Sequence, residues 1–220
     1  GAETGLVGYW NFDGGSASDL SANVLGGTLT DGAAIIASDA PVGGSTTTPG
    51  ANALLLDGVD DFVVIGDDPA ALKLIGPMTV EAWFNHPVGG VASPAVIASK
   101  AGYFGPSWVM DLLSDGTVEF IAFGENGVDT PSFTVSTTAL DDGVWHHVAG
   151  VWDGTSAYLY VDGALESSGA PGPTGLYDTT DEVVIGADAT FDPTALFTGE
   201  IDEVRIWDID RTQADIAASM

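Results

Sequence analysis

Five oxygen-bearing side chains stand in turns or at strand ends, where they could bind a hard metal ion. Asp19 and Asn23 follow the first apolar segment, Asp57 and Asp60 lie in the turn DGVDD, and Asp202 lies in the last apolar segment. Ca²⁺ prefers several oxygen ligands from carboxylates, amides and backbone carbonyls. If the two ends of the chain lie side by side, these stretches meet, and the sequence predicts a calcium site there. In the alternative, the aspartates only shape turns and cap backbone amides.

An aromatic cluster around a Gly-Pro pair could bind a sugar. Tyr103, Phe104 and Trp108 lie in or beside the segment YFGPSW, and an exposed aromatic ring can stack on the apolar face of a pyranose. We predict that this cluster lies at the rim of a sheet and forms a glycan platform. In the alternative, the loop folds down onto the core and its aromatic rings only pack there, as most of the other tryptophans should.

The histidines do not indicate a metal centre or a catalytic base. His146 and His147 are neighbours in a strand-like segment, so their side chains point to opposite faces and cannot bind one ion from one side. His86 stands alone before Pro87. No G-x-S-x-G motif accompanies the many serines and aspartates, so nothing supports a Ser-His-Asp triad. We therefore assign structural roles to the histidines.

The position of Asp202 depends on the segment GEIDEVRIWD, residues 199–208. With a period of two, one face of this segment carries Ile201, Glu203, Arg205 and Trp207, and the other carries Glu200, Asp202, Val204 and Ile206. Acidic and apolar residues on both faces predict a central strand that is covered on one side. The segment 7–13 has the same character. Because chain termini of a domain often lie close together, we expect the two ends to pair in one sheet.

Strand-like segments recur between turn signals along the whole chain. They are 7–12, 33–37, 53–56, 62–65, 78–84, 95–99, 108–113, 117–123, 132–135, 145–152, 157–161, 183–185 and 199–208. Asp-Gly pairs between them are typical of tight hairpins, and the pair Asp162-Gly163 gives the clearest one. The segments 40–51 and 168–174 predict surface loops. Only 212–219 is predicted to be helical, with Thr212 as N-cap and Asp215 three residues later.

The fold class is therefore all-β, with one domain over residues 1–220 built from two packed antiparallel sheets and a short C-terminal helix. The formal net charge is −28, from 4 basic and 32 acidic residues. This charge makes nucleic acid and anionic membranes poor partners and favours cations. No apolar run reaches the roughly 18 residues that span a bilayer, so we expect no membrane insertion. The chain has no cysteine. It begins at Gly1, which is typical of a mature fragment without its targeting signal.

Several segments taken together resemble a known family. They are YWNFDGG with the following Asp19, Leu20, Ser21 and Asn23, then ALLLDGVDDFVVIG, MTVEAWFN, VWHHVAGVWDGTSAYLYVDGAL, VVIGAD and GEIDEVRIWDIDRTQADI. They resemble the laminin-G-like, concanavalin A-like jelly rolls, particularly bacterial laminin-G-type modules related to pentraxins. The resemblance covers Gly8 to Ile216 and implies two curved antiparallel sheets, commonly with a structural Ca²⁺. This fold hosts lectins, adhesion modules and glucanases, so the resemblance alone does not define the function.

The resemblance to pentraxins also implies a ligand-binding site in which calcium ions hold the ligand. Such a site needs acidic residues in the loops 101–107 and 187–194. Asp188 and Asp192 match the second loop, but the first loop carries no acidic residue. We therefore keep Asp188 and Asp192 as candidate ligand-binding residues only.

Glucanases of this fold use a Glu, an Asp and a second Glu on one face of a strand. Glu200 and Asp202 match the beginning of that pattern, but Val204 and Arg205 occupy the positions where the second Glu would fall. Without that acid the leaving group has no proton donor. We predict that the chain is not an enzyme and has no catalytic residue.

The sequence thus predicts a non-catalytic, secreted or cell-surface binding module with structural calcium. Its expected partner is a polysaccharide or a cell-surface glycan or protein, together with other domains of a larger parent protein. An adhesion or spacer module without a small ligand is the alternative, and a glucanase-like glycoside hydrolase is the remote one.

Overall fold

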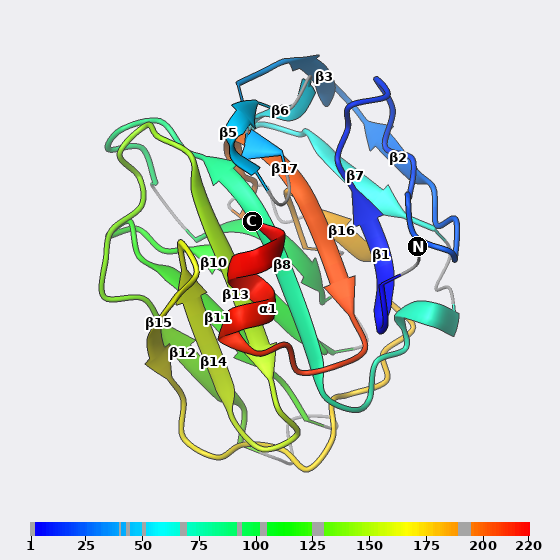
Figure 1. The fold of residues 1–220 in the computed structure, drawn as a ribbon, viewed down its shortest axis with the longest axis vertical. Helices are drawn as coiled ribbons and strands as arrows, with labels where there is room; N and C mark the ends of the chain where they lie inside the picture. Colours follow the sequence, from blue (N-terminus) through cyan, green and yellow to red (C-terminus); the bar gives the residue numbers. More distant parts are fainter. Residues whose placement is uncertain are drawn as a thin grey trace.

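The computed structural model shows two antiparallel β-sheets packed face to face, which confirms the predicted all-β class (Figure 1). It describes residues 3–39, 41–42, 45–49, 52–66, 70–91, 94–101, 105–124, 130–188 and 195–220. Tyr103, Phe104 and Asp192 lie outside the described residues. No helix within these ranges is long and apolar enough to cross a membrane.

Sheet A has eight strands and contains both ends of the chain. Its order is β15 (Ala164–Ser168), β14 (Ala157–Val161), β13 (His146–Trp152), β8 (Met78–Asn85), β17 (Thr198–Trp207), β6 (Asn52–Asp57) and β3 (Ala34–Ala37), while β1 (Leu6–Trp10) also pairs with β17. The antiparallel pairing of β1 with β17, visible in Figure 1, confirms the prediction that the two ends meet.

Sheet B has seven strands. Its order is β12 (Ser132–Val135), β11 (Val118–Ala122), β10 (Trp108–Leu112), β9 (Ala95–Lys100), β16 (Val183–Ile185), β7 (Phe62–Ile65) and β2 (Gly27–Thr30). A small hairpin of β4 (Pro41–Val42) and β5 (Ser45–Pro49) occupies part of the segment 40–51, where the sequence predicted only a loop. A 3₁₀ turn covers Ala70–Leu72.

Alternating residues of the two sheets form one apolar core between them. In sheet A, for example, Val80, Ala82 and Phe84 point inward, and in sheet B, Met110 and Phe120 do. The intervening residues therefore point to the outer faces, as the pleat requires. The hairpin of β14 and β15 turns at Asp162 and Gly163, whose φ angles of 47° and 75° are both positive. This matches the tight turn that the Asp-Gly pair predicted.

A bulge in β17 changes which side chains share a face. The pairing with β8 shifts register between Asp202 and Arg205, and Glu203 between them has a φ of 54°. Ile201 therefore points into the core before the bulge, and Val204 and Ile206 do so after it. The predicted face that joined Ile201 to Glu203 and Arg205 is wrong, because one extra residue reverses the alternation.

The helix α1 (Gln213–Ser219) lies on the outer face of sheet A, as Figure 1 shows. Thr212 is its N-cap, and Thr212 and Asp215 form a reciprocal capping box, as predicted. Ile216 packs against Ala149 and Val151 of β13. The short helix thus covers part of sheet A with an apolar contact.

Candidate functional site

Asp19, the first predicted calcium ligand, is bound by the protein itself. Its Oδ1 accepts hydrogen bonds from the backbone N–H groups of Tyr9 (2.9 Å) and Ser21 (2.7 Å). Its Oδ2 accepts from Ser21 Oγ (2.7 Å) and Leu25 N–H (2.7 Å). Asn23 donates from Nδ2 to the carbonyl of Val7 at 2.9 Å. With these contacts, Asp19 and Asn23 hold the loop after β1 against that strand.

Asp202, unlike Asp19, is not saturated by hydrogen bonds from the described part of the chain. It is 0 % exposed, its Oδ1 accepts a hydrogen bond from Glu203 N–H (2.8 Å), and its Oδ2 has no hydrogen-bond partner in the described part of the chain. Burial raises the pKa of Asp202 to about 9, and the charges of Glu203 and Asp13 add to this shift. A buried carboxylate beside further acids needs a proton or a cation. A hard cation at Asp202, near the charge of Asp13, would supply that partner.

Asp57 and Asp60 lie at the other end of β6 from this pair. Asn52 begins β6 and donates from its backbone N–H and its Nδ2 to Asp13, whereas Asp57 ends the strand. Five residue steps of a strand span about 17 Å. The prediction that all five ligands meet in one site is wrong, because β6 separates Asp202 from the DGVDD turn and Asp19 is saturated by its own loop.

The predicted aromatic platform is only partly within the described residues. Trp108 is 1 % exposed and points into the core between the sheets. It offers no ring face to solvent, so the expectation that it lies exposed at a rim is corrected, because it takes the inward position in β10. Asp188 follows the end of β16, on sheet B.

The outer face of sheet B carries two opposed carboxylates that the sequence analysis did not select. Asp111 of β10 lies directly opposite Glu119 of β11. Asp111 is 8 % exposed, and its Oδ1 has no hydrogen-bond partner among the residues described. Burial raises the pKa of Asp111 to about 7, and the charge of Glu119 contributes; burial also raises the pKa of Glu119. Like charges directly opposite each other destabilise a sheet, so this pair is costly without a ligand.

An exposed aromatic ring lies on the strand next to Glu119. Phe133 of β12 is 56 % exposed and pairs with Ile121 of β11, while the neighbouring Val135 pairs with Glu119. The registers place Phe133 and Glu119 diagonally across two adjacent strands, which is within reach of an aromatic side chain. We call Asp111, Glu119, Ile121 and Phe133 the sheet-B patch. It combines an apolar ring with an acceptor that lacks a donor.

A network of charged side chains lies between sheet A and α1. Arg211 donates from Nη1 to both oxygens of the buried Glu81, at 2.8 and 2.9 Å, and from Nη2 to the carbonyl of Asp215 in α1. Arg205 pairs with Glu203 and stacks over the ring of Tyr9 at 4.4 Å. These contacts neutralise both acids and attach the helix, so the network is structural.

His147 lies against this network without joining it as a base. Both of its ring nitrogens are buried and make no hydrogen bond within the described ranges. Burial lowers its pKa to about 3, and the charge of Arg205 adds to the shift. The ring packs edge-on to Trp83 at 5.4 Å between centroids. His147 is therefore neutral and part of the packing, as the sequence predicted.

Glu200 has no catalytic partner in the parts of β17 and its neighbours that the structure describes. Its Oε2 accepts a hydrogen bond from Ser38 Oγ at 2.7 Å. The next acid after Asp202, Glu203, is engaged by Arg205 and by the hydroxyl of Tyr9 (2.8 Å). This does not provide the two facing carboxyl groups of a retaining glycosidase.

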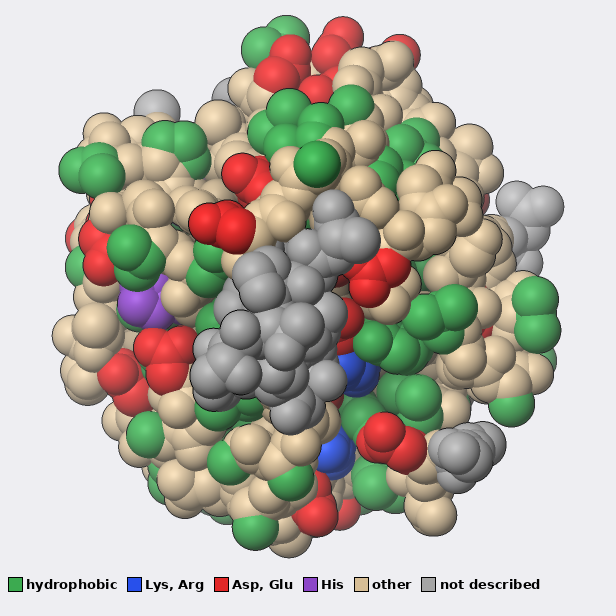
Figure 2. Space-filling view, turned by 45° about the horizontal axis from the view of Figure 1, so that its top comes forward, with side chains coloured by type: hydrophobic (Ala, Val, Ile, Leu, Met, Phe, Trp, Pro, Cys, Tyr) green, Lys and Arg blue, Asp and Glu red, His purple; other side chains and the backbone are tan. Residues whose placement is uncertain are grey.

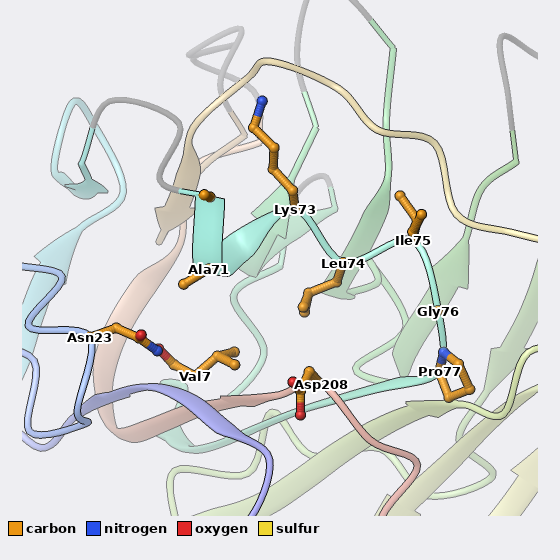
Figure 3. Close-up of a pocket in the computed structure, with 10 residues that line it drawn as sticks. Val7, Asn23, Ala71, Lys73, Leu74, Ile75, Gly76, Pro77 and Asp208 are labelled. Carbon is orange, nitrogen blue, oxygen red and sulfur yellow. The ribbon is translucent and has the colours of Figure 1, made fainter.

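A pocket of about 420 Å³ lies beside β1, between this strand and the segment 70–77 (Figure 3). Val7, Leu74 and Pro77 give it apolar walls, and Asn23 and Asp208 are its polar groups. Figure 3 shows that the ammonium group of Lys73 extends away from it. Its lining contains no aromatic ring, which makes it a less suitable sugar site than the sheet-B patch.

The surface carries many acidic side chains and few basic ones. Figure 2 shows red acidic groups scattered over one face between green hydrophobic areas, with only small areas of blue. Acids dominate because the chain has 32 of them against 4 basic residues. Neutral or cationic ligands are therefore favoured electrostatically.

A family model described as the concanavalin A-like lectin/glucanases superfamily, of laminin G type, matches residues 57–217. A search of curated protein sequences finds no match. Among solved structures, domain 4 of AbnA, an extracellular arabinanase from Geobacillus stearothermophilus, in complex with arabinotriose, is similar with a TM-score of 0.72 and 20 % identity over 98 % of both chains.

Two toxin domains are also similar. The binding domain of Paraclostridial Mosquitocidal Protein 1 has a TM-score of 0.74 and 12 % identity over 97 % of this chain and 51 % of that one. The binding domain of botulinum neurotoxin DC in complex with rat synaptotagmin II has a TM-score of 0.64 and 10 % identity over 97 % of this chain and 50 % of that one. The chain thus spans about half the length of these toxin domains. At these identities the similarities establish the fold.

Proposed function

Because the chain belongs to the concanavalin A-like lectin/glucanases superfamily, we propose that it is a non-catalytic carbohydrate-binding module of a secreted or cell-surface protein. The observation that carries this proposal is the sheet-B patch. There, the exposed ring of Phe133 lies diagonally across from Glu119, and Glu119 pairs with Asp111, which has a buried carboxylate oxygen without a donor among the described residues. Similar structures that are themselves binding domains support it.

The sheet-B patch has the two kinds of group that a sugar needs. Phe133 and Ile121 form an apolar row on which the C–H face of a sugar ring can pack. Glu119 and Asp111 lie in the next row, where their oxygens accept hydrogen bonds from sugar hydroxyls. A hydroxyl that donates to Asp111 Oδ1 satisfies a buried acceptor, which is worth more than a bond exchanged with water.

The charge of the sheet-B patch indicates the class of ligand. Two acidic side chains repel anionic sugars and polyanions, so a neutral polysaccharide is the expected ligand. The sheet-B patch crosses three adjacent strands, β10, β11 and β12. An extended chain of sugar rings fits such a surface better than a single monosaccharide.

We also propose structural calcium at Asp202 and Asp13. A bound cation supplies the positive charge that lets the buried Asp202 carboxylate ionise beside Asp13. Asp202 lies in β17 and Asp13 follows β1, so holding the two together fixes the terminal strands of sheet A. This role is structural, and no step of glycan binding depends on it.

Affinity electrophoresis through gels that contain neutral polysaccharides, arabinan among them, tests the proposal. The wild-type chain should be retarded by at least one polysaccharide, and Phe133→Ala and Asp111→Asn should lose most of the retardation. Leu165→Ala is the matched control, because Leu165 is an exposed apolar strand residue of sheet A. Retardation that survives in Phe133→Ala would contradict the assignment of the patch.

The adhesion or spacer module is the second candidate function. One similar structure, the binding domain of botulinum neurotoxin DC, half of whose length this chain matches, is in complex with the protein synaptotagmin II. If no polysaccharide retards the chain, this candidate replaces the carbohydrate-binding proposal. Release of reducing sugar from β-glucans, lost in Glu200→Gln, would instead restore the enzymatic alternative.

A further inference from the structure

Three aspartates converge in the turn that joins β6 of sheet A to β7 of sheet B. One carboxylate oxygen from each of Asp57, Asp60 and Asp61 lies within 4.8 Å of those of the other two. Asp57 Oδ1 accepts a hydrogen bond from Val59 N–H (2.8 Å), and Asp61 Oδ2 accepts one from Asp57 N–H (3.0 Å). The backbone of the turn thus holds two of the three carboxylates in fixed positions.

Asp61, one of the three aspartates, also has a buried oxygen with no donor. The residue is 4 % exposed, and its Oδ1 makes no hydrogen bond in the ranges that the structure describes. Gly32 lies against that oxygen, since a Cβ placed there would be 2.6 Å from Asp61 Oδ1. Any larger residue would fill the space beside the carboxylate. A buried acceptor next to two further carboxylates indicates a missing positive partner.

A fourth acid, Asp31, lies close to the cluster, in the turn that joins β2 of sheet B to β3 of sheet A. Partial desolvation and the charges of Asp31, Asp57 and Asp61 raise the pKa of Asp60. No ion pair connects these aspartates to a basic side chain within the described residues. The chain therefore does not neutralise this group of charges.

The ligand chemistry selects the type of ion. All donors are carboxylate oxygens, which suit hard cations, and the site has no nitrogen or sulfur ligand for zinc or copper. Asp57 and Asp60 are exposed, so water can complete the coordination. Ca²⁺ tolerates such mixed and irregular geometry better than Mg²⁺, which requires a near-ideal octahedron.

We propose that Asp57, Asp60 and Asp61 form a calcium site at the edge of the sandwich, separate from the site at Asp202. The ion links two connections between the sheets, the β6–β7 turn that supplies the ligands and the β2–β3 turn that carries Asp31 and Gly32. Its role is to hold the two sheets together at this edge. The inference goes beyond the proposed function, since it holds whether or not the sheet-B patch binds a glycan.

Amide NMR spectra of the metal-free protein, titrated with Mn²⁺ and then with Ca²⁺, test the site directly. Mn²⁺ should broaden the amide signals of residues 31–33 and 57–61, and excess Ca²⁺ should restore them. The variant Asp202→Asn keeps this response, because the two sites are separated by the length of β6. Unchanged signals in these two turns up to millimolar metal would overturn the proposal.

Asp60→Asn separates a ligand from a merely structural acid, because Asp60 makes no hydrogen bond in the described structure. The variant should bind Ca²⁺ at these turns roughly tenfold more weakly or worse, since one of three charged ligands is gone. In EDTA its melting temperature should not fall below that of the wild type, because a repulsive charge has been removed. Asp210→Asn, at an exposed position outside the site, is the matched control and should bind as the wild type does. Equal Ca²⁺ affinity in Asp60→Asn and the wild type would exclude Asp60 as a ligand.

Discussion

The outer faces of the two sheets both contain buried acids, but they differ in how the charge is balanced. On sheet A, Arg211 and Arg205 neutralise Glu81 and Glu203, and α1 covers the group. On sheet B, Asp111 faces Glu119, and no basic side chain pairs with either of them in the described part of the chain. An acid within a strand is structural where the chain supplies its counter-charge and is available for a ligand where it does not.

The small number of basic residues explains this difference. The chain has only four, Lys73, Lys100, Arg205 and Arg211. Both arginines are used beneath α1, and Lys100 is buried and donates to the carbonyl of Asp181 at 2.6 Å. The remaining acids of the interior must therefore be satisfied by neutral donors of the protein, as Asp19 is, or by protons, metal ions or ligand donors.

Removal of the counter-charge on sheet A should have the largest effect. Arg211→Met leaves the buried Glu81 without its closest counter-charge, because Arg205 is 3.7 Å away and only the neutral donors of Trp207 and Ser219 are closer. The free energy of unfolding should therefore fall by about 3–5 kcal/mol. Urea denaturation at neutral pH measures this. The double variant Glu81→Gln/Arg211→Met should recover part of the loss. A loss below about 1 kcal/mol would show that the network does not hold the helix.

The unneutralised Asp202 should make metal-free stability depend on pH. Its folded pKa of about 9 lies above the ordinary value, so the unfolded state loses its proton first as the pH rises. Relative to Asp202→Asn, the free energy of unfolding of the wild type in EDTA should therefore fall by about 1.4 kcal/mol per pH unit in the middle of the range between 3.8 and about 9. Excess Ca²⁺ should reverse the trend in the wild type only. Parallel stability curves for the two proteins would contradict the cation proposal.

Removal of an acid from sheet B should raise the free energy of unfolding, whereas removal of Arg211 from sheet A should lower it. Asp111 has a folded pKa of about 7, raised from 3.8, so the ligand-free fold loses stability as the pH rises between these two values and the loss levels off above the folded pKa. At pH 8, Asp111→Asn should raise the free energy of unfolding by about 1–3 kcal/mol, and at low pH the gain should disappear. Chemical denaturation at the two pH values checks this. A destabilised Asp111→Asn at pH 8 would place Asp111 with the structural acids.

Removal of the N-cap of α1 should have the smallest effect on stability. Thr212→Ala removes the capping box and should cost about 1 kcal/mol, because Thr212 and Asp215 satisfy each other's backbone groups. Thermal melting compared with Thr28→Ala, an exposed threonine of β2, provides the measurement and its control. Equal melting temperatures for the two variants would show that the helix depends on Arg211 and Ile216 alone.

Local patterns in the sequence predicted local features of the structure correctly. The Asp162-Gly163 hairpin, the Thr212 cap and the alternating strands depend on neighbouring residues, so they could be read directly. The pairing of β1 with β17 also followed, from the similar character of the two ends. The bulge at Glu203 did not, because its positive φ is adopted by a residue without a glycine signal.

The candidate sites were harder to predict because they depend on register and distance. Asp57 and Asp202 lie in segments that pair, but at opposite ends of β6, and no pattern along the chain shows this. Asp111 and Glu119 become a pair only through the register of β10 with β11. The one signal that could have found them is an acid at an alternating position within an otherwise apolar strand.

An amide NMR titration with a soluble oligosaccharide of the polysaccharide that best retards the chain tests the central claim most directly. If the sheet-B patch binds the sugar, the shifts cluster at residues 109–111, 119–121 and 133–135 and vanish in Phe133→Ala. Shifts that cluster instead at the pocket beside β1, or on the outer face of sheet A, would contradict it.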